Sequence, residues 1–147
     1  MMSEKTQTRV LILVMTYPHP SKKNREVVCT AGITESNEWV RLYPIDYRYR
    51  PSEQKFKKYQ WIEVELYPKG SGNDNRKESR KPDLETIKLC GNPLSTKNSW
   101  QERKAIIDSM PHNTMNELYA SYDTDKTSLG IIRPYEILDL VIEEDES

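Results

Sequence analysis

Short strand-like segments fill the first two-thirds of this chain, and helix-like segments follow them. The strand-like segments are rich in β-branched and aromatic residues, and they end at proline, glycine or polar residues. Chains that alternate strands with helices build parallel sheets, whereas chains that separate the two in sequence build α+β folds. The order of the segments therefore predicts an α+β fold, with two helices after the fifth strand.

The five predicted strands differ in their hydrophobic pattern. Residues 9–17 are apolar on both faces, which is typical of a central, buried strand. Residues 26–34 and 38–45 are joined by a short polar link, which favours a hairpin. Residues 59–67 alternate between apolar and polar side chains, as in a strand with one buried face, and residues 84–90 form a shorter segment.

A sheet of five or six short strands twists strongly and can close on itself. We therefore expect a small, strongly twisted, antiparallel-rich sheet or a partly closed β-barrel. At the level of architecture this arrangement resembles the PUA-like barrels. The resemblance implies a ligand such as RNA or an unusual DNA base.

Two helices are predicted after the strands, and each begins with the spacing of a capping box. Ser99 stands three residues before Glu102, and Thr114 stands three residues before Glu117. Each helix is expected to carry apolar residues, which in the second helix share one side. In the first helix they are Trp100, Ile106 and Ile107, and in the second they are Met115, Leu118, Tyr119 and Tyr122.

Two further segments complete the expected fold. Residues 129–142 have a high apolar content, which predicts a bend at Arg133 and Pro134 and then a last strand that returns to the core. Residues 68–82 are rich in Gly, Ser, Asn and charged residues, which is typical of an exposed, flexible loop.

The whole chain, residues 1–147, is expected to form one domain, because this length is enough for a core of its own. Residues 1–8 and 143–147 are polar and predict frayed tails. The two cysteines, Cys29 and Cys90, are too few for a disulfide framework or a zinc site, which favours the reducing cytoplasm. No apolar run is long enough to cross a membrane, so we expect no membrane partner.

The net charge of −1 hides a strong asymmetry along the chain. Residues 41–81 contain 11 Lys and Arg against 6 Asp and Glu, which gives +5. Residues 101–147 contain 4 Lys and Arg against 11 Asp and Glu, which gives −7. The chain is therefore not a general polycation, but it has the charges for a local basic face of the kind that binds phosphates.

Aromatic and basic residues are interleaved between Trp39 and Lys81, where five of the nine tyrosines lie. Rings stack on bases and cations pair with phosphates, so this pattern predicts a surface that binds RNA, DNA or a nucleotide. The candidate residues are Arg41, Tyr43, Tyr47, Arg48, Tyr49, Arg50, Lys55, Lys57, Lys58, Trp61, Arg76 and Arg80. We favour the stretch from Tyr47 to Lys58, because Glu53 is its only carboxylate.

Two other interpretations of the same segment stay open. Tyr and Trp also dominate protein interfaces, so the chain is alternatively an interaction subunit that docks a partner through a Tyr- and Trp-rich face. Glu63 and Glu65 share a strand face with Trp61 and can pair with Arg41, which favours ordinary sheet packing. Residues 21–25 add a basic loop whose position the sequence does not fix.

Catalysis is a weaker expectation. Asp83 followed by Glu102 and Lys104 matches the sequence motif of many metal-dependent nucleases, but Glu102 is already expected to cap a helix. Glu63, Glu65 and Asp74 are further possible metal ligands, although solvated glutamates on a strand are commoner. His19 with Cys29 is the one available thiol–imidazole pair. There is no phosphate-binding glycine loop, and we expect no cofactor and no metal.

Overall fold

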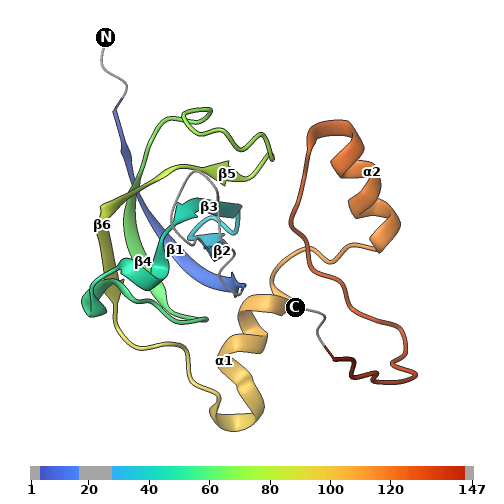
Figure 1. Cartoon of the computed structure of the whole chain (residues 1–147). Coiled ribbons are helices and arrows are strands. Elements are labelled where there is room, and N and C mark those ends of the chain that lie inside the picture. Colours follow the sequence, from blue (N-terminus) through green and yellow to red (C-terminus); the bar gives the residue numbers. More distant parts are fainter. Residues whose placement is uncertain (1–3, 17–27, 145–147) are drawn as a thin grey trace.

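A curled, six-stranded sheet forms a half-barrel, and two α-helices follow the strands (Figure 1). The structure is a computed structural model that describes residues 4–16 and 28–144. The α+β fold predicted from the order of the segments is confirmed, including both helices after the last long strand. The predicted basic loop at residues 21–25 lies outside the described residues, and so does His19.

The elements have the following bounds. The strands are β1 (Thr6–Met15), β2 (Val28–Thr34), β3 (Trp39–Ile45), β4 (Trp61–Leu66), β5 (Ser79–Arg80) and β6 (Pro82–Cys90). Two short 3-10 helices, η1 (Tyr47–Tyr49) and η2 (Ser52–Gln54), lie between β3 and β4. The α-helices are α1 (Lys97–Asp108) and α2 (Met115–Asp125).

The strands lie in the order β5-β3-β2-β1-β4-β6. All neighbours are antiparallel except β3 and β5, which run parallel. The strand β1 is central as predicted, and Val10 pairs with both Thr34 on β2 and Ile62 on β4. The hairpin predicted between the second and third strands is also confirmed, since β2 and β3 pair along their length.

Both faces of the central strand are buried, as its apolar sequence predicts. Val10 and Ile12 belong to a larger core on one face, together with Phe56. Leu11 belongs to a smaller core on the other face, which the helix α1 helps to cover through Ile106 and the nearby Met110. The predicted alternation on β4 is confirmed as well: Ile62, Val64 and Leu66 are buried in the larger core, and the residues between them are partly exposed.

The start of α1 differs from the prediction. Thr96, not Ser99, occupies the N-cap position, and three consecutive residues, Asn98 to Trp100, have left-handed backbone angles. Glu102 does not close a capping box on Ser99, because its carboxylate accepts a hydrogen bond from the Ser95 N–H at 2.7 Å. The predicted capping box of α2 is confirmed, with reciprocal bonds between Thr114 and Glu117.

The predicted last strand is wrong. In residues 129–144 the only pairing is an isolated bridge of Ile131 with His112, and the residues after it are exposed. The edges of the sheet explain the difference, because β5 already occupies the outer edge of β3. At the other edge, the Gln54 amide donates to carbonyls of β6, including Leu84 O at 3.0 Å and Ile87 O at 3.2 Å. Part of each sheet edge is therefore already used by other bonds.

Candidate nucleic-acid interface

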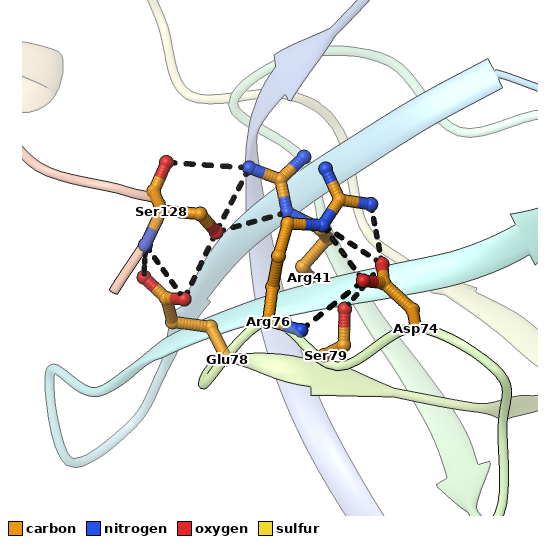
Figure 2. A network of polar contacts seen from close by, with 6 residues as sticks. All are labelled: Arg41, Asp74, Arg76, Glu78, Ser79 and Ser128. Atoms are coloured by element: carbon orange, nitrogen blue, oxygen red, sulfur yellow. Dashed lines mark hydrogen bonds and ion pairs between the residues drawn. The ribbon is translucent and has the colours of Figure 1, made fainter. Parts of the chain in front are cut away.

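Arg41 and Arg76, two of the predicted binding residues, lie in an internal polar network (Figure 2). The Arg41 side chain is only 9% exposed and donates to the Ser128 hydroxyl at 3.2 Å and to the Ser128 carbonyl at 3.4 Å. Burial lowers the pKa of Arg41, and the neighbouring Arg76 guanidinium lowers it further. Figure 2 shows the two guanidinium groups side by side, so this network has brought two like charges together.

A carboxylate balances each half of the network. The Arg76 Nε donates to both carboxylate oxygens of Asp74 at 2.9 Å, and the Ser79 hydroxyl donates to the same carboxylate at 2.6 Å. Burial alone would raise the pKa of Asp74, but the bonds from Arg76 and Ser79 outweigh it and lower that pKa to about 2. Asp74 therefore stays ionised under all ordinary conditions.

Glu78 holds the chain that follows α2. Its carboxylate accepts from the backbone N–H groups of Ser128 and Leu129, both at 2.8 Å, and from the Ser128 hydroxyl at 2.9 Å. Arg80, another predicted binding residue, donates to the Tyr67 carbonyl at 3.0 Å. Glu78 thus connects the loop over residues 68–82 to the chain after α2, while the donors of Arg41, Arg76 and Arg80 are used on partners within the fold.

The favoured stretch from Tyr47 to Lys58 is divided between core and surface. The Tyr47 hydroxyl donates to the Phe56 carbonyl at 2.7 Å, and the two rings pack edge to face with centroids 5.2 Å apart. Arg50 forms ion pairs with Asp46 at 2.9 Å and with Glu85 at 3.3 Å. The Tyr47 hydroxyl and the Arg50 guanidinium therefore bind other groups of the same chain.

The other predicted residues lie at different depths. Arg48 and Tyr49 are exposed on η1, and Lys55 and Tyr43 are half-buried. Trp61 packs against the smaller core, and the Arg9 guanidinium lies 5.1 Å from its ring centroid.

Lys57 and Lys58 are the predicted residues that the structure leaves most available. Both are exposed, and neither forms an ion pair within the described part of the chain. They lead into Tyr59, whose backbone is fixed by two hydrogen bonds. Its N–H donates to the Ile12 carbonyl at 2.6 Å, and its carbonyl accepts from the Leu94 N–H at 2.7 Å. The two lysines therefore directly precede Tyr59, an aromatic residue whose backbone is held in place by hydrogen bonds.

An arginine and a tryptophan from α1 complete this surface. The Arg103 guanidinium lies 4.3 Å from the ring centroid of Tyr59 and 5.4 Å from that of Trp100. The Arg103 Nε also donates to the Leu94 carbonyl at 2.9 Å, which fixes the cation between the two rings. Lys104 follows Arg103 directly on α1 and is exposed. We call this set the Trp100 patch: Lys57, Lys58, Tyr59, Trp100, Arg103 and Lys104.

Trp100 is the most unusual member of the patch. Its side chain is 52% exposed, although tryptophan is normally well buried. The backbone over Asn98 to Trp100 is left-handed, and the ring lies outside the smaller core. A hollow of about 480 Å³ is lined by polar residues before and after Trp100 in the sequence, namely Ser95, Lys97, Asn98, Gln101 and Glu102.

Sequence reasoning missed Trp100, Arg103 and Lys104 as binding residues. The Ser99 and Glu102 spacing suggested a helix start, and it placed Trp100 among the apolar residues of that helix. The available signal was the presence of two cations, Arg103 and Lys104, close to Trp100 in the sequence.

The carboxylates considered for catalysis lie in separate places in the structure and bind different partners. Asp83 is paired with the Lys5 ammonium at 2.5 Å, whose hydrogen bond lowers the pKa of Asp83, and Glu102 is bound to the Ser95 N–H. Glu63 and Glu65 line a separate hollow of about 250 Å³ near Lys88. Among the described residues, no three His, Cys, Asp or Glu side chains come together in a way that would hold a metal ion. Cys29 and Cys90 are both free thiols.

The described part of the chain contains no helix that is long and apolar enough to span a membrane. A protein-family model described as "Domain of unknown function (DUF8758)" matches residues 6–109, which run from the start of β1 to the end of α1. The match includes every residue of the Trp100 patch, whereas α2 and the chain after it lie outside the matched residues. No curated protein and no solved structure gives a significant match.

Proposed function

The chain belongs to this family of unknown function, and we propose that it is a nucleic-acid-binding module that holds single-stranded RNA or DNA on the Trp100 patch. The observation that carries the proposal is the exposed Trp100 ring next to a guanidinium fixed between two rings. Base stacking on an exposed aromatic ring is the common way in which proteins hold single strands. Unstacked bases are available in single strands, so the patch favours them over a duplex.

The charges of the patch support a phosphate ligand. Lys57, Lys58 and Lys104 are exposed and unpaired among the described residues, and Arg103 faces rings instead of a carboxylate. Cations without a protein partner are free to replace the counterions of a nucleic-acid backbone. The networks of Arg41, Arg50 and Arg76 lack this freedom, so we place the ligand on the Trp100 patch and away from them.

The architecture agrees with this proposal at a coarse level. The sheet curls into a half-barrel. We also propose that this half-barrel has the PUA-like architecture expected from the sequence. In such barrels a small curved sheet with adjoining helices provides the base for RNA or DNA contacts. A cytoplasmic location, favoured by the two free thiols, is part of the same proposal.

Salt dependence tests the electrostatic part of the proposal. For single strands, the logarithm of affinity falls by about 0.7 per phosphate contact for each tenfold rise in salt. We expect binding of a short labelled oligonucleotide to weaken steeply with salt, and we expect the Lys57→Ala/Lys58→Ala double variant to reduce the slope by about 1.4. Fluorescence anisotropy titrations over a range of potassium chloride concentrations measure both quantities.

The matched control is the Lys69→Ala/Lys88→Ala double variant, which removes two exposed lysines that are not part of the patch. It should keep the slope of the wild-type chain. If both double variants change the slope equally, the binding is diffuse and the Trp100 patch has no special role.

A second function is favoured by one separate observation. The face of α2 exposes Met115, Tyr119 and Tyr122 to solvent, and none of its residues is buried. Exposed tyrosines on a helix fit the alternative of a protein-interaction subunit. Association with a protein partner that tolerates salt and is lost in the Tyr119→Ala variant would support this alternative.

A further inference from the structure

Among the described residues, the six most exposed large apolar side chains all lie near the end of the chain. We call residues 133–144 the C-terminal segment. Six large apolar side chains in it are between 69% and 102% exposed. They are Tyr135, Ile137, Leu138, Leu140, Val141 and Ile142. A contiguous apolar run of this kind marks an interaction site, because water is an unfavourable neighbour for it.

The base of the C-terminal segment is fixed on the body of the molecule. The Ile131 carbonyl accepts from the Asn113 N–H at 2.7 Å, just before the segment begins. Arg133 then forms an ion pair with Asp108, the last residue of α1, at 2.8 Å. Beyond this point the segment runs alone, beside no other element (Figure 1). It therefore begins at a defined place and presents its apolar side chains outward.

Charge identifies the kind of surface that fits the segment. The segment carries four carboxylates, Glu136, Asp139, Glu143 and Glu144, against one arginine. The exposed face of α2 is also acidic, with Glu117, Asp123 and Asp125, so it would repel the segment. The Trp100 patch offers the opposite charge from Lys57, Lys58, Arg103 and Lys104, together with an exposed ring for apolar contact. Of these two surfaces, α2 and the Trp100 patch, only the patch is complementary in charge to the C-terminal segment.

We propose that the C-terminal segment of one chain docks on the Trp100 patch of a second copy, and that the exchange is reciprocal. Within one chain the six apolar side chains stay 69–102% exposed, so the segment leaves them free for a second copy, and β5 and Gln54 already use part of each sheet edge. A reciprocal exchange gives a closed two-fold dimer in which each copy supplies one segment and one patch. The proposal does not rest on nucleic-acid binding, although both ligands would use the same patch.

The available area is sufficient for such a dimer. Full burial of an apolar side chain removes on the order of 60–120 Å² from water. Six side chains in each of two segments, with the matching surface that they cover, would bury about 1,500–3,000 Å² in total. Stable protein interfaces start at about 1,200 Å². The exchange therefore buries enough surface to hold two copies together.

The test is the mass of the full chain in solution without nucleic acid, measured by sedimentation equilibrium over a range of protein concentrations. The wild-type chain should be a dimer, and the Leu138→Asp/Leu140→Asp variant should be a monomer. Both side chains are exposed in the single chain, so the variant should fold normally, as circular dichroism will confirm. The Tyr119→Ala/Tyr122→Ala variant on α2 is the control and should remain a dimer.

A charge exchange identifies the docking surface. Lys57→Glu/Lys58→Glu alone and Glu143→Lys/Glu144→Lys alone should each weaken the dimer tenfold or more, and combining the four changes should restore it. A wild-type monomer would overturn the proposal, including a monomer whose segment folds back on its own patch. A dimer that survives Leu138→Asp/Leu140→Asp, or that is not restored by the combined exchange, would overturn it too. Because no nucleic acid is present, failure here leaves the proposed function untouched.

Discussion

Asp74 shows how single side chains position the loop before β5. Its carboxylate accepts bonds from Arg76 and from the Ser79 hydroxyl, and Arg76 in turn lies beside the buried Arg41 (Figure 2). Removing the carboxylate would leave the Arg76 guanidinium without its ion-pair partner, next to the positive charge of Arg41. The loss of one partner from a buried charged network is more costly than the net value of the network.

We therefore predict that Asp74→Asn lowers the free energy of unfolding at pH 7 by about 1–2 kcal/mol. The pKa of Asp74 is about 2 in the folded chain against an ordinary value of 3.8. A carboxyl with a lowered pKa stabilises the fold above its ordinary pKa, and that stability is lost as the pH falls toward the folded value. The difference between wild type and variant should thus shrink between about pH 4 and pH 2.

Urea unfolding of both proteins at a series of pH values measures this difference. Other carboxyls with a low pKa, such as Asp125, are present in both proteins, so their contribution cancels. A difference that stays constant down to pH 2 would show that the ionised carboxylate is not what stabilises this loop.

The partners of charged residues could not be predicted from the sequence. Arg41 contacts Ser128, which is 87 residues away, and Arg50 contacts Glu85, which is 35 residues away. The sequence marked both arginines as cations near rings, and that description also fits Lys57 and Lys58. Only the folded chain separates cations that are paired from cations that are exposed.

At the scale of elements, a local sequence pattern predicted a segment correctly where the surrounding structure favours the same conformation. The alternation of β4 and the capping box of α2 are both present in the structure. The start of α1 was mispredicted because Ser99 and Glu102 have the right spacing, while the backbone there is left-handed. The apolar residues 135–142 were assigned to a strand because hydrophobicity alone does not show whether a segment finds a partner strand, and in the structure these residues pair with none.

The left-handed turn at the start of α1 makes a prediction about stability. For residues other than glycine this conformation costs about 1 kcal/mol or more of folding free energy, because Cβ comes close to the backbone. Ser99 has a φ of 56° and its side chain is exposed. We predict that Ser99→Gly raises the free energy of unfolding by about 0.5–1 kcal/mol.

The control for this change is Lys104→Gly, in the regular part of the same helix. Glycine there should lower the free energy of unfolding by about 1 kcal/mol, because it loses more backbone entropy on folding. Thermal unfolding followed by circular dichroism compares the two variants. Destabilisation by both glycines would mean that Ser99 lies in an ordinary right-handed helix.

At the scale of the whole molecule, the fold brings the Trp100 patch together from two distant parts of the chain. The turn before β4 supplies Lys57, Lys58 and Tyr59, and α1 supplies Trp100, Arg103 and Lys104. The connection passes through Leu94, whose backbone bonds to both Tyr59 and Arg103. The sequence predicted a basic, aromatic surface near Lys57, but it could not show that α1 completes that surface.

The most direct test of the proposed function is the affinity of the Trp100→Ala variant for short single-stranded RNA and DNA. Stacking of one base contributes about 1–3 kcal/mol, so we predict a loss of about tenfold to a hundredfold. Trp100→Phe keeps a ring and should retain most of the affinity, and Tyr119→Ala on α2 should bind like the wild-type chain. An affinity of Trp100→Ala equal to that of the wild-type chain, for both RNA and DNA, would contradict the account.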